Sequence, residues 1–174
     1  NPPFNLKKWY DSSLSHDARR ADYGLPPEGN ANYAWILHIL SKLKAGRGVA
    51  GFLLANGALG DSDAAEIRQK LIEKDKAEAI IALPRELFYT TDISVTLWIL
   101  NQKKDGGMWH GHKQRNRKGE ILFMDLRQWN ENAIKGEQKK KVQLVKEQVE
   151  RATDIYFRWQ SEGTDGKNFA KPEL

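Results

Sequence analysis

The spacing of hydrophobic residues changes along the chain and predicts alternating helices and strands. Over 32–45, apolar side chains recur every third or fourth position, which is typical of a helix that packs on one face. Residues 49–56 and 77–83 are apolar almost throughout, which favours strands buried on both faces of a parallel sheet. A helix over 62–75 separates them, and 93–101, rich in branched and aromatic residues, predicts a further strand. This order indicates an α/β layer arrangement.

The predicted helices carry signals for where they start and stop. Asn30 or Asn32 is a candidate cap for the first helix, and Gly46 is a candidate terminator. Asp63 and Glu66 have the spacing of a capping box at the second helix. These residues predict both helix starts and the end of the first helix.

Polar and basic segments flank this alternating core. Residues 5–32 lack sustained periodicity and predict a long loop. Residues 102–119 are basic, and two interpretations stay open for them: contact with phosphates, or a solvated and mobile hairpin connection. We expect a strand over 120–126, a long helix with seven-residue apolar spacing over 137–160, and a loose tail over 161–174.

The composition narrows the class of protein. The chain has 174 residues, enough for a domain with its own core, and its net charge of +5 mildly favours a polyanionic partner. It has no cysteine, which excludes disulfides and thiolate metal sites, and His110-Gly111-His112 is too short and isolated to predict a metal site. No apolar run approaches the roughly 18 residues that span a bilayer, and no signal peptide is visible, so we expect a cytoplasmic protein without a membrane partner.

Asn1-Pro2-Pro3-Phe4 is the stretch that suggests a chemistry. The two prolines fix φ and remove two backbone donors, and Asn1 is pushed toward extended geometry. The result is a stiff corner that offers the Asn1 side-chain oxygen and the Pro2 carbonyl as fixed acceptors, followed by the flat ring of Phe4. Taken alone, the same residues also fit a simple turn before a loop.

These acceptors suit the methylation of an exocyclic amine on a nucleobase. Its nitrogen is a poor nucleophile because the lone pair is delocalised into the ring. Two acceptors that bind its N–H groups draw the nitrogen toward tetrahedral geometry and stabilise the positive charge that develops on it, while an aromatic ring stacks on the base. If the predicted strands form, Asn1–Phe4, Asn56-Gly57 and loop 84–92 share the carboxyl edge of the sheet, where ligand sites lie in such folds.

Asn1-Pro2-Pro3-Phe4 is similar to the catalytic motif of amino-group DNA methyltransferases that act on adenine N6. Further segments, in the same order, resemble the modification (M) subunit of type I restriction-modification systems. They are Tyr-Gly-Leu-Pro-Pro-Glu-Gly-Asn-Ala-Asn-Tyr-Ala-Trp at 23–35, Leu-Ala-Asn-Gly-Ala-Leu at 54–59 with Glu66-Ile67-Arg68, 81–84 with 87–89 and 97–100, and Ile155-Tyr156 with Trp159. The family commonly has glycines where Asp61-Ser62-Asp63 stands and Ile-Pro where Ile93-Ser94 stands, which leaves the shape of those loops open.

The resemblance implies a fold and a methyl donor. Residues 1–126 would be the C-terminal, catalytic half of a Rossmann-like methyltransferase sheet, and 127–174 a C-terminal helical extension and tail. The donor would be S-adenosylmethionine, held by a glycine-rich loop that in this family precedes the catalytic motif, so we expect its site upstream of this chain. We therefore expect the chain to be a piece of a longer protein and inactive alone.

The same resemblance implies a substrate, site residues and partners. The substrate would be an adenine in duplex DNA, flipped into a pocket. Asn1 and Pro2 would bind its amine and Phe4 would stack on its ring, as the catalytic residues. The other substrate-binding residues would be Pro3, Phe88 and Tyr89. The partners would be a specificity (S) subunit, which reads the DNA sequence, and a restriction (R) subunit.

Two alternatives stay open at this point. One is a non-catalytic module that docks the S subunit and DNA through loop 102–119 and helix 137–160. The other is an amino methyltransferase acting on protein glutamine or RNA, because an amide nitrogen poses the same chemical problem. The stretch Gly-Asn-Ala-Asn-Tyr-Ala-Trp at 29–35 favours the type I family over this second alternative.

Overall fold

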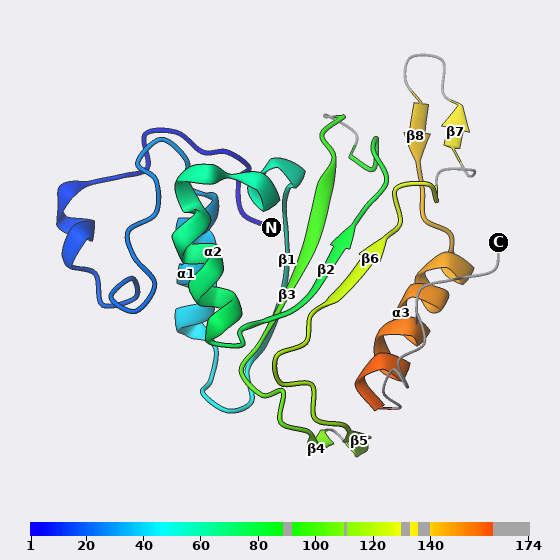
Figure 1. Cartoon of the computed structure of the whole chain (residues 1–174). Helices are drawn as coiled ribbons and strands as arrows, with labels where there is room; N and C mark the ends of the chain where they lie inside the picture. The colour runs from blue at the N-terminus through cyan, green and yellow to red at the C-terminus, as the bar shows by residue number, and fades with distance from the viewer. Residues whose placement is uncertain (89–91, 110, 130–132, 136–139, 162–174) are drawn as a thin grey trace.

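Three layers make up the chain, with two helices on one face of a central sheet and a third helix on the other (Figure 1). The computed structural model describes residues 1–88, 92–109, 111–129, 133–135 and 140–161. The helices are α1 (Asn32–Lys42), α2 (Ala65–Glu73) and α3 (Lys146–Ser161), with short 3-10 turns η1 (Ser12–His16), η2 (Asn56–Gly60) and η3 (Ser62–Ala64). The strands are β1 (Val49–Ala55), β2 (Ala77–Ala82), β3 (Val95–Asn101), β4 (Gly107–Trp109), β5 (His112–Gln114), β6 (Leu122–Asp125), β7 (Ala133–Lys135) and β8 (Lys140–Val142). Within these described ranges, no helix has both the length and the apolar character of a membrane span.

The central sheet has four strands in the order β1-β3-β2-β6, and its pairing is mixed. β3 runs antiparallel to both of its neighbours, with Val49 opposite Asn101 in β1, whereas β2 and β6 are parallel. The prediction that 49–56 belongs to a purely parallel sheet was therefore wrong in direction, although the strand itself is confirmed. The predicted burial on both faces is also wrong for the first half of β1, an edge strand in which Val49 and Gly51 are exposed. An apolar run does not report the direction of the neighbouring strand.

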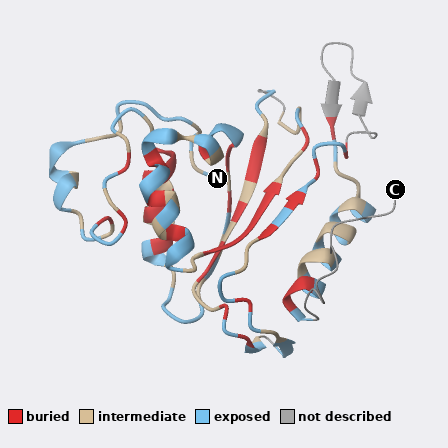
Figure 2. Ribbon diagram, viewed as in Figure 1, coloured by how far each residue is buried: buried red, intermediate tan, exposed pale blue. Residues whose placement is uncertain are grey.

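Each face of the sheet buries its own hydrophobic cluster. The cluster under α1 and α2 includes Ile80 and Trp98, and the cluster under α3 includes Ile81 and Met124. Ile80 and Ile81 separate in this way because successive side chains of a strand point to opposite faces. Figure 2 shows the buried positions concentrated on α1 and the central strands. Both faces of β2 are thus covered, as its apolar run predicted.

The helix caps agree only in part with those predicted: Asn30 Oδ1 accepts the N–H of Asn32, the first residue of α1, at 3.0 Å, whereas the other predicted caps differ. α1 begins at Asn32 behind an N-cap at Ala31 that makes no side-chain cap, and the positive φ of Gly46 comes after the helix has ended. α2 begins only at Ala65, because 62–64 form a 3-10 turn. Asp61 caps that turn, accepting a hydrogen bond of 3.1 Å from the Asp63 N–H. The predicted capping box does not form, because Asp63 lies in the 3-10 turn, Glu66 lies in the first turn of α2, and the N-cap of α2 is Ala64.

The C-terminal helix is shorter than predicted. α3 starts at Lys146 instead of 137, and β8, which pairs with β7, occupies part of the difference. The apolar seven-residue spacing misled the prediction because it continues back to Val142, which lies in β8. α3 packs on the sheet through a cluster that includes Ala152 and Trp159. The predicted tail lies outside the described residues from 162 onward.

The basic loop contains the hairpin β4–β5, but two of its cations are buried rather than solvated. The Lys104 ammonium bonds the Asp75 carboxylate and the carbonyls of Ala77 and Glu120, at 2.9 and 2.6 Å to the carbonyls. Arg117 is fully buried against Glu78, as described below. Lys104 and Arg117 therefore fit neither the phosphate-contact interpretation nor the solvated-hairpin interpretation of this loop. The sequence could not reveal this, because it does not show which carboxylates lie near them in the fold.

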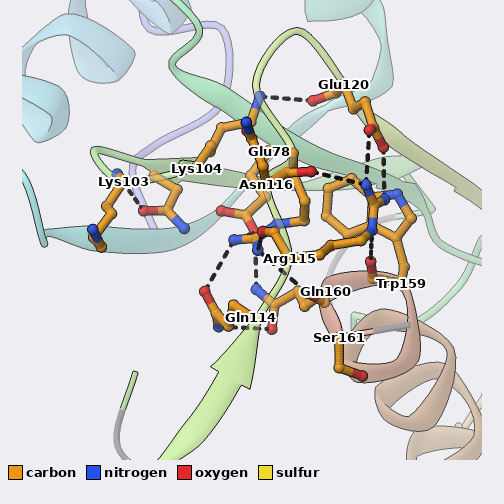
Figure 3. Close-up of polar contacts among 12 residues, drawn as sticks. Glu78, Lys103, Lys104, Gln114, Arg115, Asn116, Glu120, Trp159, Gln160 and Ser161 are labelled. Carbon is orange, nitrogen blue, oxygen red and sulfur yellow. Dashed lines mark hydrogen bonds and ion pairs between the residues drawn. The ribbon is translucent and has the colours of Figure 1, made fainter. Parts of the chain in front are cut away.

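A third cation of the loop, Arg115, makes a bidentate pair with Glu120, with N···O distances of 2.7 and 2.6 Å (Figure 3). This guanidinium lowers the pKa of the Glu120 carboxyl, and partial burial opposes the shift. A lowered folded-state pKa stabilises the fold above the unfolded carboxyl's pKa of about 4.3, and that contribution is lost as the pH falls.

We therefore expect Glu120→Gln to lower the free energy of unfolding at pH 7 by less than about 1 kcal/mol, since Glu120 is partly exposed. The difference from the parent chain should shrink as the pH falls below about 4.3 and through the lowered pKa of Glu120. Urea unfolding between pH 3 and 8 measures it, with the exposed Glu28→Gln as the control. A difference that stays constant over this range contradicts the electrostatic cause.

Candidate functional site

The corner Asn1–Phe4 meets the loop that follows β2. The Phe4 and Phe88 rings are in edge-to-face contact, with centroids 6.1 Å apart and planes at 75°. The Asn56 N–H, just beyond β1, donates to the Ser94 carbonyl at 2.9 Å, so the carboxyl end of β1 lies at the same rim (Figure 1). We predicted from the sequence that Asn1–Phe4, Asn56-Gly57 and loop 84–92 share one edge of the sheet, and these contacts confirm that prediction.

Exposure at the rim matches a surface that receives a ligand. Asn1 and Pro3 are exposed, whereas Pro2 and Phe4 are half-buried. Asn1 is therefore accessible to a ligand, while Phe4 is partly covered and contacts Phe88. Of the two predicted substrate-binding aromatics in the loop after β2, Phe88 contacts Phe4 and Tyr89 lies outside the described residues.

Immediately after the corner, the chain is tied to the start of α1. The Asn5 N–H donates to Asn32 Oδ1 at 3.0 Å, and Asn32 Nδ2 donates back to Asn5 Oδ1 at 2.9 Å. Asn30 Nδ2 adds a bond of 3.3 Å to the same Asn5 oxygen, and the Ala31 N–H donates to the Leu6 carbonyl at 3.0 Å. Two segments that are about 25 residues apart in sequence thus form one local unit.

Tyr33 connects this unit to the core. Its hydroxyl donates to the Ala58 carbonyl at 2.8 Å and accepts from Arg68 Nη1 at 3.1 Å. Its ring packs edge-to-face on Trp98 of β3, with centroids 6.3 Å apart. Burial raises the pKa of Tyr33, and the Arg68 guanidinium partly opposes that shift. Tyr33 therefore stays neutral and fixes α1 against β3 and the turn after β1.

Two arginines in the loop before α1 are occupied within the protein. Arg19 and Arg20 both pair with Asp17, which holds the pKa of that carboxyl below its usual value. Arg19 Nη1 also lies 2.8 Å from His38 Nδ1, and Arg20 lies over the Trp9 ring at 5.6 Å. These contacts hold the loop in shape and leave neither arginine available as a free phosphate ligand.

No metal centre is formed by the part of the chain that the structure describes, where no three His, Cys, Asp or Glu side chains gather in a ligating group. His110 of the isolated His-Gly-His stretch lies outside that part. The chemistry that the described rim supports rests on acceptor oxygens and aromatic rings.

Sequence reasoning missed the part played by Asn32. Its place at a helix start suggested a cap, and capping is the common role of asparagine there. The signal that pointed elsewhere was the second asparagine two residues earlier, since Asn30 Oδ1 accepts the Asn32 N–H at 3.0 Å and so leaves the Asn32 side chain for another partner.

Comparison with known proteins identifies the family of this layered α/β chain. The chain belongs to the N-6 DNA methylase family, whose model matches residues 1–172. It is 42% identical over 130 residues to the type I restriction enzyme HindI methylase subunit of Haemophilus influenzae, an alignment that covers 74% of this chain and 26% of that protein. It is 35% identical over 167 residues to the MjaIX methylase subunit of Methanocaldococcus jannaschii, covering 92% of this chain and 27% of that one.

Solved structures show the same fold. The methyltransferase subunit of a type I restriction-modification system from Streptococcus thermophilus superposes with a TM-score of 0.70 and 26% identity, over 90% of this chain and 30% of that one. A modification subunit of a putative type I restriction enzyme from Vibrio vulnificus gives a TM-score of 0.58 at 17% identity, over 90% of this chain and 30% of that one. The chain spans about a quarter of the length of the relatives it matches in sequence.

Proposed function

We propose that this chain is the catalytic half of a DNA adenine-N6 methyltransferase subunit of a type I restriction-modification system. The observation that carries the proposal is the contact of Phe4 with Phe88 beside a proline-stiffened pair of acceptors, in a chain that belongs to the N-6 DNA methylase family. The chain would act within a longer polypeptide, since its relatives are several times as long.

In this proposal the corner prepares the target nitrogen. Asn1 Oδ1 and the Pro2 carbonyl accept the two N–H groups of a flipped adenine, which makes the N6 lone pair available for attack. The lone pair forms a bond to the methyl carbon, the carbon–sulfur bond breaks with its electrons returning to sulfur, and N6 loses one proton to solvent. The two acceptors stabilise the cationic nitrogen more strongly than the neutral amine, so they lower the barrier.

The half-buried aromatic rings would hold the base. Phe4 and Phe88 are in edge-to-face contact, and the flipped adenine would stack on one of these rings; stacking is worth about 1–3 kcal/mol per base. Pro3 and Tyr89 would make further contacts with the flipped adenine. S-adenosylmethionine is the methyl donor that the family implies, and Asn1 and Pro2 would bind the acceptor amine rather than the donor.

The proposed partners are duplex DNA and the S and R subunits. Two observations favour α3 and the β4–β5 hairpin as a docking surface for another subunit. Val149 and Phe157 on α3 are 49% and 56% exposed. A hollow of about 600 Å³ lies where α3 ends, with a lining that includes Trp109, Lys113 and Phe157. This docking role is compatible with the catalytic proposal. It is also what the alternative function, a module that assembles subunits without catalysis, would require.

The test is the identity of the methylated product. The full-length protein, assembled with its S subunit, is supplied with methyl-labelled S-adenosylmethionine and with DNA, RNA or protein in separate reactions. We expect label in N6-methyladenine from DNA, detected by mass spectrometry of the digested nucleosides. Label in glutamine side chains or RNA instead of DNA would replace the proposal by the other amino methyltransferases, and no label with intact assembly would favour the docking module.

A further inference from the structure

The Gly-Asn-Ala-Asn-Tyr-Ala-Trp stretch at 29–35 contains a buried polar side chain that the proposed mechanism does not use. We propose that this residue, Asn32, is a positioning residue that sets the direction of the corner Asn1–Phe4 through Asn5. The inference rests on the proposed function, because it concerns how the acceptors are aimed at the target amine.

Both described hydrogen bonds of the Asn32 side chain are made with Asn5. It is 1% exposed, and a buried amide needs partners for both its oxygen and its nitrogen. Both atoms bond Asn5, one through the backbone N–H and one through the side-chain oxygen, at 3.0 and 2.9 Å. Two parallel bonds between the same residues fix orientation as well as distance.

Asn5 is the residue at which the direction of the corner is decided. It follows Phe4 directly and has a φ of +51°, in the left-handed region that side chains other than glycine seldom adopt. Asparagine tolerates this conformation better than most residues, and here the bonds from Asn5 to Asn32 and Asn30 hold it in place. Release of Asn5 to a negative φ would rotate the whole corner away from Phe88, because the corner lies on the far side of that bond.

The other end of this link is rigid. The neighbouring residue, Tyr33, is fully buried and bonded to the Ala58 carbonyl and Arg68. Asn32 therefore transmits the position of the core to the corner, whereas Asn5 itself is exposed and has no core contact of this kind. A shift of about 1 Å in a reacting group can cost about a hundredfold in rate, so the link bears directly on turnover.

The test uses the same isosteric change at the two ends of the link. Asn5 uses only its side-chain oxygen, so Asn5→Asp keeps every bond described here, and aspartate also tolerates a positive φ. Asn32→Asp loses the donor and places a carboxylate oxygen against Asn5 Oδ1. In the full-length, assembled enzyme we expect Asn32→Asp to lower kcat about 10- to 100-fold and Asn5→Asp to stay within about threefold of the parent.

The readout separates positioning from folding. Turnover is measured at saturating DNA and expressed per bound S-adenosylmethionine, and KM for S-adenosylmethionine should be unchanged in both variants. If Asn32→Asp does not fold, Asn5→Gly takes its place: it removes the acceptor from an exposed position and frees φ, and we expect about a tenfold loss of kcat.

Each outcome is decisive. Equal turnover in Asn32→Asp and Asn5→Asp, or parent-like turnover in Asn5→Gly, overturns the positioning role. A large loss in Asn5→Asp overturns it as well, because that variant preserves the link. The proposed function itself fails on a different result, full activity of Asn1→Ala, so the two failures are distinguishable.

Discussion

Replacing Asn1 with alanine in the full-length, assembled enzyme is expected to lower kcat by about 10²–10³-fold. The change removes one of two acceptors that stabilise charge on the target nitrogen, and the loss of one such preorganised partner has this size in other active sites. KM for DNA should change little, because the remaining contacts with DNA persist. The measurement is single-turnover methylation at saturating S-adenosylmethionine.

Two further variants identify the cause. Asn1→Asp keeps an acceptor oxygen and should lose less activity than Asn1→Ala. Asn116→Ala changes an exposed asparagine whose side-chain oxygen accepts from the Lys118 N–H, and it should behave like the parent. Undiminished turnover in Asn1→Ala would falsify the role proposed for the corner.

Replacing Glu78 with leucine is expected to destabilise the chain by about 3–5 kcal/mol. Glu78 Oε1 lies 2.8 Å from Gln160 Nε2 (Figure 3). The same oxygen lies 3.1 Å from Arg117 Nη2, and the side chains of Glu78 and Arg117 are both fully buried. The variant leaves the guanidinium charge buried without its carboxylate, and such uncompensated charges carry penalties of this size. Urea unfolding of the parent and the variant measures the difference.

Matched variants separate buried from exposed pairs. The double variant Glu78→Leu with Arg117→Met removes both charges, so it should be more stable than Glu78→Leu alone. Asp105→Asn breaks the surface pair of Asp105 with Lys103, and it should cost less than about 1 kcal/mol. If Glu78→Leu costs no more than Asp105→Asn, then Glu78 does not neutralise Arg117 in solution.

The sequence predicted the sequential order of the elements better than their directions. The spacing of apolar residues located α1, β1, β2 and β3 within a few residues, because that spacing depends on which faces of an element are buried. It did not reveal that β3 runs against β1, since strand direction depends on the connections made in space. The start of α3 was misplaced for a related reason, because Val142 extends the helical spacing into a strand.

At the candidate site, the sequence predicted which residues meet but not how they are held. Asn1–Phe4 and Phe88 were expected at one rim, and the structure brings Phe4 and Phe88 together. The link between Asn5 and Asn32 was not foreseen, because a bond across 27 residues leaves no periodic trace. The roles of Asn1, Pro2 and Phe4 in catalysis remain proposals that the experiments above address.

The buried Glu78 cluster also restricts how α3 sits on the sheet. Apolar side chains along a helix tolerate a slide of one turn, because one aliphatic contact replaces another. The Glu78 carboxylate, in contrast, bonds both Arg117 and Gln160, and a shift of α3 along its axis would break the bond to Gln160 without forming another. These bonds fix the last turn of α3 in one register on the sheet. A force applied to the exposed side of α3 would therefore act on β2 through Glu78 instead of sliding the helix along the sheet.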